Sequence, residues 1–230
     1  MFKLIAGAVL VLCVAACAAP PARPVTPWLP GQPSLQSLPA PGEYPIDSSG
    51  SELRLLVYRA GALSNLGHNH VMVNRAVSGL VQIGSSVSAS SFSVSAAVDD
   101  FLVDDAEARS EEGEDFPGGI AEDAKAGTRR NMLSNAVLNA VEFPSITVKS
   151  VSLTGTLEAL NADLEISVAG HTSTISMPFA LRGDAHHLIA AGSAELRQSA
   201  LGLTPYSLVH GALQVQDAMQ LKFKITVATN

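Results

Sequence analysis

The sequence predicts an all-β fold, an antiparallel barrel of about eight strands with one inserted helix. The first observation behind this prediction is an alternation of apolar and polar residues, typical of strands with one buried face, that recurs along most of the chain. The second is that a single segment shows the period of an amphipathic helix. The third is composition: of 230 residues, 47% are hydrophobic and 15% are charged, which is enough to fill a large core.

Eight segments carry the two-residue alternation, and we expect each to be a strand: 53–59, 77–83, 92–98, 146–148, 160–168, 175–181, 187–196 and 219–227. The last is the clearest, because its apolar residues from Met219 to Val227 alternate with Gln, Lys and Thr. Polar outer faces favour a water-exposed barrel, since a membrane barrel would place its apolar residues outside. A lipocalin-like barrel of eight strands leaves room inside for one small ligand.

The helical segment is expected over residues 121–140. An apolar stripe at spacings of three and four would consist of Ala126, Arg130, Leu133, Val137 and Ala140. Glu122 and Asp123 lie in the first turn, where they suit the helix dipole. Phe143-Pro144 would end the helix. Residues 111–119, which precede it, are acidic and glycine-rich and predict a mobile loop.

The first 16 residues are predicted to be a lipoprotein signal peptide. Lys3 precedes an apolar run at 4–16 that is shorter than the roughly 20 residues of a membrane span. Residues 14–17 (VAAC) resemble a bacterial lipobox, in which the cysteine is acylated and becomes the new N-terminus. Cys17 is therefore the expected lipid anchor to the membrane. The alternative is an ordinary signal peptide cut near Ala19.

The cysteines predict export without a disulfide, because Cys13 would be removed and Cys17 would carry lipid. No acidic residue follows the anchor at positions 18 and 19, which by resemblance to enterobacterial sorting favours the outer membrane. We thus expect a cell-envelope protein held on the periplasmic side.

Residues 17–42 are expected to form a tether, and residues 43–230 the barrel domain. Nine of the 13 prolines lie between Ala18 and Pro45, a density that favours an extended, semi-rigid chain. Such a tether would hold the domain away from the membrane surface.

Composition argues against a nucleic-acid partner, because the net charge is −7 and aromatic residues make up 5%. Catalysis has little support either. No Gly-rich phosphate loop or G-x-S-x-G elbow is present, and the proximity of Ser64 to His68 is weak evidence in a serine-rich chain. The sequence therefore predicts a binding protein and not an enzyme.

Several short motifs, in their order and spacing, resemble the YceI-like family. They occupy 44–47 (YPID), 130–133 (RNML), 143–146 (FPSI), 154–157 (TGTL), 168–172 (VAGHT) and 197–203 (RQSALGL). The resemblance implies a periplasmic, lipocalin-like barrel that binds a polyisoprenoid or quinone-type lipid in an elongated apolar cavity. One segment departs from the familiar pattern: residues 60–70 (AGALSNLGHNH) resemble a branch that carries a Gly-His-x-His motif, for which the same ligand is not assumed.

His68 and His70 are two residues apart, so in an extended chain both imidazoles would lie on one face. Such a pair suits Zn, Cu or Ni, with a third ligand from His186, His187 or His210. Alternatively, one imidazole organises the Gly-rich turn and the other lines the cavity mouth. Arg130 and Tyr206 are further candidates for the mouth and for a lipid head.

Two functions remain open on this evidence. One is a barrel that binds an apolar lipid, with a cavity lined by eight alternating residues: Leu55, Val57, Phe92, Val94, Ile166, Phe179, Phe223 and Ile225. The other is a metal-dependent sensor or accessory protein centred on His68 and His70. The choice of inward faces depends on register, since a slip of one residue would invert every assignment.

Overall fold

A computed structural model describes residues 33–183 and 187–229. These residues form a closed antiparallel barrel of eight strands, so the predicted fold class is confirmed. The predicted signal peptide (1–16), the lipidation site at Cys17 and the candidate ligand His186 lie outside the described residues.

The eight barrel strands include every predicted strand. In their order around the barrel they are β1 (Gly42–Ala60), β3 (Ser78–Ile83), β4 (Ser91–Ala97), β6 (Ser145–Thr156), β7 (Ala159–Val168), β8 (His171–Gly183), β9 (His187–Arg197) and β11 (Leu213–Ala228). The pairing of β11 with β1 closes the barrel, with Leu53 opposite Phe223. Alternation along these strands turns one side inward, and the largest apolar cluster fills the interior.

Three shorter strands extend the sheet: β2 (His70–Asn74), β5 (Leu102–Val103) and β10 (Ser207–Leu208). The first half of β1 pairs with β3, and its second half pairs with β2, which in turn pairs with β5. A second apolar cluster covers the outer face here and includes Leu56, Val71, Val73 and Phe116.

The inserted helix, α2 (Glu122–Leu133), is shorter than the predicted span of 121–140. It ends at Ser134, whose backbone is extended and whose hydroxyl donates to the Asn131 carbonyl. Val137 and Ala140 therefore lie beyond the helix, and Ala126 and Arg130 are exposed. The predicted stripe was therefore right only in part. Leu133, Val137 and Ala140 pack against the core, while the helix residues that face the barrel are Ala124, Thr128, Asn131 and Met132, spaced by three or four.

The segment 104–119, which includes the predicted mobile loop at 111–119, is held against the barrel wall by side-chain contacts. It contains a second short helix, α1 (Ala106–Ser110), and the buried ring of Phe116. Glu112, with a side chain 2% exposed, accepts from Arg54 of β1 at 2.7 Å and from Lys222 of β11. Arg109 donates to the Pro117 carbonyl at 2.7 Å.

A bulge in β6 changes the inward side partway along the strand. The pairing of β6 with β7 shifts between Ser150 and Ser152, so the inward residues are Ile146 and Val148 before it and Leu153 after it. The shift leaves Val151 64% exposed on the outside.

The last part of the predicted tether contacts the barrel. Leu35 is buried among core residues, and the Pro33 carbonyl accepts from the Gly183 amide at 3.1 Å. The packed domain therefore includes residues 33–42 as well as the predicted span from 43. Within the described residues, no helix has the length and apolar character needed to cross a membrane.

Candidate functional site

The barrel interior holds two adjoining cavities. The smaller has a volume of about 160 Å³ and the larger about 400 Å³. Both are lined by Leu53, Val148, Ile166 and Leu221, so they meet end to end along the barrel. The walls of the smaller cavity are apolar except for Ser90 and Ser91.

All eight residues predicted to line a cavity do lie on these walls. Leu55 and Val57 line the larger cavity, and Ile166 lines both. The remaining five line the smaller one: Phe92, Val94, Phe179, Phe223 and Ile225. The inward register of these strands was thus read correctly from their alternation.

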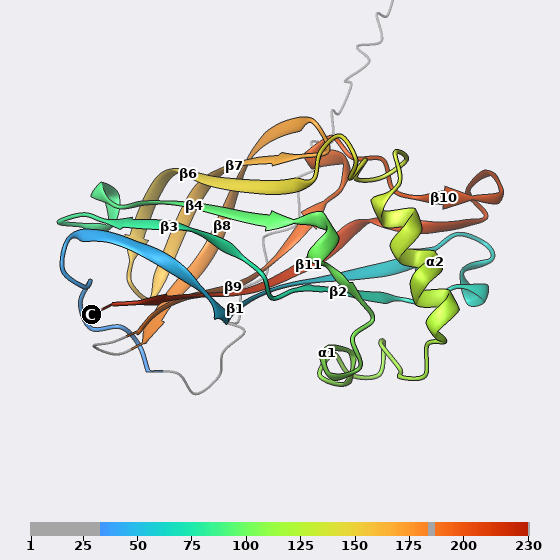
Figure 1. The fold of residues 1–230 in the computed structure, drawn as a ribbon, viewed down its shortest axis with the longest axis horizontal. Helices are drawn as coiled ribbons and strands as arrows, with labels where there is room; N and C mark the ends of the chain where they lie inside the picture. Colours follow the sequence, from blue (N-terminus) through green and yellow to red (C-terminus); the bar gives the residue numbers. More distant parts are fainter. Residues whose placement is uncertain (1–32, 184–186, 230) are drawn as a thin grey trace, which may run out of the picture.

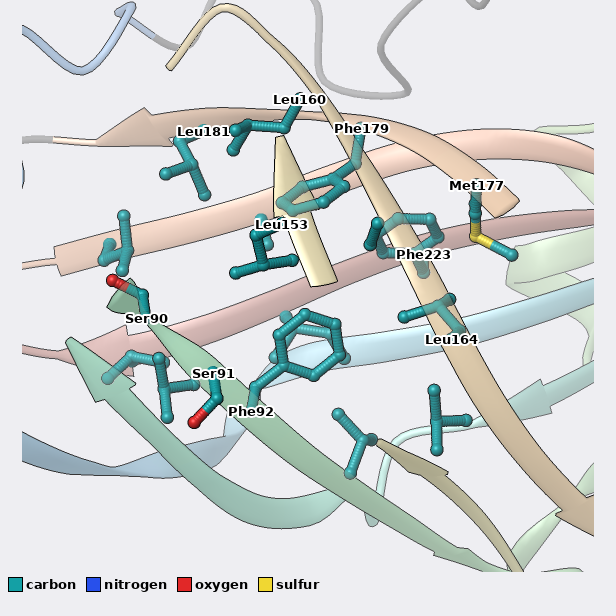
Figure 2. A pocket seen from close by; sticks show the side chains of 18 of the residues that line it. Ser90, Ser91, Phe92, Leu153, Leu160, Leu164, Met177, Phe179, Leu181 and Phe223 are labelled. Carbon is teal, nitrogen blue, oxygen red and sulfur yellow. The ribbon is translucent and has the colours of Figure 1, made fainter. Parts of the chain in front are cut away.

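Figure 2 shows how side chains from different strands converge on the smaller cavity. The rings of Phe92, Phe179 and Phe223 point into the same space, with the Met177 thioether beside them. Because these side chains come from β4, β8 and β11, the cavity exists only when the barrel is closed.

The larger cavity lies at the end of the barrel that α2 covers (Figure 1), away from the end where the chain terminates. Ala124, Thr128 and Asn131 of α2 form part of its wall. Leu208, which is 44% exposed, also forms part of its wall. Of the predicted mouth residues, His68, His70 and Tyr206 line this cavity.

Arg130 does not line either cavity among the described residues, which corrects its prediction as a mouth residue. It lies on the exposed side of α2, one position from Arg129. Arg129 is turned the other way, and its guanidinium donates to the Phe101 carbonyl at 3.0 Å and the Asp99 carbonyl at 2.9 Å. Arg129 therefore fastens the helix to the barrel.

His70 is held by a buried ion pair that lies behind it. Its Nδ1 is 2.7 Å from Oδ2 of Asp104, and the other oxygen of Asp104 accepts from Arg109 Nη1 at 2.5 Å. The Val71 amide also donates to Asp104 at 2.9 Å. Asp104 is 1% exposed and Arg109 is 3% exposed, while the His70 side chain is 15% exposed toward the cavity.

The charge of Asp104 is stabilised by its partners. Burial alone would raise its pKa, but the His70 hydrogen bond, the Val71 amide and the Arg109 charge act the other way, and the net pKa is lowered. Asp104 also has a φ of 55°, in the left-handed region that aspartate tolerates better than most residues. An ionised carboxylate accepts hydrogen bonds and has none to donate, so Nδ1 of His70 carries the proton between them.

The predicted metal pair lacks a third ligand in the part of the chain that the structure describes. The ring centroids of His68 and His70 lie 6.3 Å apart. Among the described residues, no cluster of three or more His, Cys, Asp or Glu side chains is suited to a metal. Nδ1 of His70 is already engaged by Asp104.

Asp104 and Arg109 are the functional residues that sequence reasoning missed. They lie 34 and 39 positions after His70, just before the segment predicted to be a mobile loop (111–119), and no periodic pattern connects them to His70. The sequence does show one arginine, Arg109, among several acidic residues that follow the apolar segment 101–103. The same pattern is also typical of an exposed ion pair.

Several solved structures resemble the barrel, among them the following two. Burkholderia cenocepacia BcnA has a TM-score of 0.59 at 14% identity, and the match covers 79% of this chain and 98% of BcnA. A mutant of the Campylobacter jejuni YCEI protein has a TM-score of 0.51 at 10% identity, over 69% of this chain and 84% of the other. At these identities the likeness shows a shared fold.

No curated protein sequence is significantly similar to this chain. The YceI-like domain family, in contrast, matches it over residues 44–227, from the start of β1 almost to the end of β11. The match covers most of the chain and nearly all of the barrel. The chain therefore belongs to the YceI-like domain family.

Proposed function

We propose that this protein is a bacterial lipoprotein whose barrel binds an isoprenoid or another long-chain apolar lipid, with quinone-type lipids included in that class. The observation that carries the proposal is the pair of end-to-end cavities, whose walls are mostly apolar. Their volumes, about 160 and 400 Å³, together fall in the range of small-molecule sites.

Burial of the lipid chain supplies enough free energy for this role. At about 0.8 kcal/mol per methylene, ten methylenes contribute about 8 kcal/mol before the cost of immobilising the chain. A free energy of that size corresponds to a dissociation constant of about 1 μM. A long tail can thus be held by walls that offer almost no polar contact.

The location forms part of the same proposal. The lipobox-like residues 14–17 support an acyl anchor at Cys17, and the small residues after it support the periplasmic side of the outer membrane. A protein placed there could keep an apolar lipid out of water between membranes. We propose binding and carriage and no catalytic step, in line with the lack of a recognised catalytic motif in the sequence.

Native mass spectrometry of the full chain, purified from its own cells without chelator or metal column, tests the proposal. We expect a discrete adduct of several hundred daltons that organic solvent extracts and that can then be identified. A bare chain from several preparations would contradict lipid carriage.

The second candidate is a metal site at His68 and His70. One observation favours it: a histidine that binds a metal through one nitrogen usually donates the other N–H to a carboxylate, as His70 does to Asp104. The same spectra test it. A small metal adduct that disappears in the double variant His68→Ala, His70→Ala would replace the lipid proposal, and less than about 0.1 metal per chain would exclude the metal.

A further inference from the structure

One polar side chain on the cavity wall, His70, is backed by a buried ion pair. His70 opens β2, and the adjoining Val71 amide and the Arg109 guanidinium both fix the Asp104 carboxylate against it. Other polar residues on the same wall, such as Gln198 and Gln214, are not backed by a buried ion pair among the described residues. Among the described residues, His70 is thus the polar side chain on this wall that a buried ion pair holds in place.

The second ring nitrogen of His70 is open to the cavity. Within residues 33–183 and 187–229, the imidazole makes its one hydrogen bond through Nδ1. No fully buried side-chain nitrogen or oxygen there lacks a partner, so Nε2 must be reachable by a molecule of the size of water. Nε2 therefore has room for one hydrogen bond from a ligand.

The contact between His70 and Asp104 determines whether Nε2 of His70 donates or accepts this hydrogen bond. Because the carboxylate holds the proton on Nδ1, the neutral form of the ring is the tautomer with its lone pair at Nε2, which accepts a hydrogen bond. A ligand head that donates an O–H fits this position, whereas an ether, ester or ketone oxygen does not.

We propose that Nε2 of His70 accepts a hydrogen bond from the hydroxyl head of the bound lipid, so that the protein selects isoprenoid alcohols or phenols over the same chains without an O–H. This inference rests on the proposed lipid-binding function. The chain would extend from His70 past Leu55 and Met72, through the junction at Ile166, toward Phe223 in the smaller cavity. Asp104 and Arg109 are positioning residues that fix the ring and touch no lipid.

The test compares two lipids that share one chain, farnesol and farnesyl methyl ether. Binding is measured by calorimetry at pH 8, with chelator present, on the chain from residue 17 onward carrying Cys17→Ser, which retains every described residue and is not acylated. We expect farnesol to bind about fivefold more tightly than the ether, the effect of one hydrogen bond. In His70→Phe the two affinities should become equal. The control His171→Phe, at an exposed histidine that lines neither cavity, should keep the preference.

Equal binding of the two lipids by the wild type, or a preference that survives in His70→Phe, would overturn the assignment. Failure of both lipids to bind would overturn the proposed function and the assignment with it. Nitrogen-15 NMR of histidine-labelled wild type gives a second measurement that needs no variant. We expect the His70 Nε2 resonance to be that of an unprotonated nitrogen and to move on addition of farnesol but not of the ether; a proton on Nε2 of the neutral ring would contradict the assignment.

Discussion

Asp104 combines three properties that are individually uncommon. It is almost completely buried, it has a positive φ, and its carboxylate receives hydrogen bonds from a histidine, an arginine and a backbone amide. Each partner favours the charged form, and together they outweigh the cost of burial. Its side chain therefore both stabilises the fold and orients His70.

Replacing Asp104 with asparagine should lower the free energy of unfolding at pH 7 by about 3 kcal/mol, because Arg109 would remain buried without its counter-charge. The pKa of Asp104 is lower in the folded protein, so its contribution is present above the unfolded-state pKa of about 4 and is lost as pH falls through the folded-state pKa. The difference between wild type and variant should shrink in acid. Urea unfolding between pH 7 and pH 3 measures this. A difference that is constant over that range would contradict the account.

The contact between His70 and Asp104 could not be predicted from the sequence. The His68 and His70 spacing predicted a shared face and a possible metal pair, since spacing reports local geometry. The partner of His70, Asp104, lies 34 residues downstream, after the barrel strands β3 and β4 and the short strand β5. Contacts of that kind depend on tertiary packing and leave no period in the sequence.

The helix α2 covers one end of the barrel but is not part of its sheet. The helix is fastened through Arg129, whose guanidinium donates to two carbonyls of the segment that joins β4 to β5. Its inward residues include Thr128 and Asn131, which explains why an apolar stripe did not identify that face. A helix that lines a cavity has less need of an apolar face than one that packs into a core.

Substituting Arg129 with alanine should loosen this attachment and reduce the free energy of unfolding by about 1 kcal/mol, since three hydrogen bonds are lost from a partly exposed side chain. The neighbouring variant Arg130→Ala is a matched control, because Arg130 is exposed and should change stability by less than about 0.5 kcal/mol. Chemical unfolding of the two variants compares them. Equal effects would mean that Arg129 does not fasten the helix.

The segment from Asp104 to Gly119 is a second fastened element. Burial alone would lower the pKa of Arg54, but the hydrogen bonds that its guanidinium donates to Glu112, Glu111 and Glu52 raise it, so the guanidinium stays charged against the barrel wall. A glycine-rich acidic composition predicted a mobile loop. The prediction failed because the matching cations, Arg54 and Lys222, lie on strands far away in sequence.

Glu112→Gln should cost about 3 kcal/mol of unfolding free energy, because it leaves the buried Arg54 with one fewer counter-charge and removes the partner of Lys222. Glu114 is exposed in the same loop, so Glu114→Gln provides a control with an expected change below about 0.5 kcal/mol. Thermal or urea unfolding measures the difference in stability between Glu112→Gln and Glu114→Gln. If Glu112→Gln were as stable as Glu114→Gln, the loop would not be held by this pair.

For the whole molecule, the barrel and its inward faces were predictable because the same alternation runs through all eight strands. In β11, for example, Phe223 and Ile225 face the cavity and Lys222 and Lys224 do not, as the alternation requires. The bulge at Ser150 breaks this rule in β6 and turns Val151 outward, which a uniform period could not anticipate. The size and shape of the cavities depend on such details and emerged only with the structure.

We propose that an apolar lipid occupies the interior of this barrel. The most direct measurement is the amount of lipid that copurifies with the full chain when the smaller cavity is filled by Val94→Trp or Phe223→Trp. The control is Val151→Trp, which places the same side chain on the outside of the barrel. We expect both cavity variants to fold, as judged by circular dichroism and a cooperative unfolding transition, and to lose most of the lipid that the control retains. Wild-type amounts of lipid in both folded cavity variants would contradict the claim.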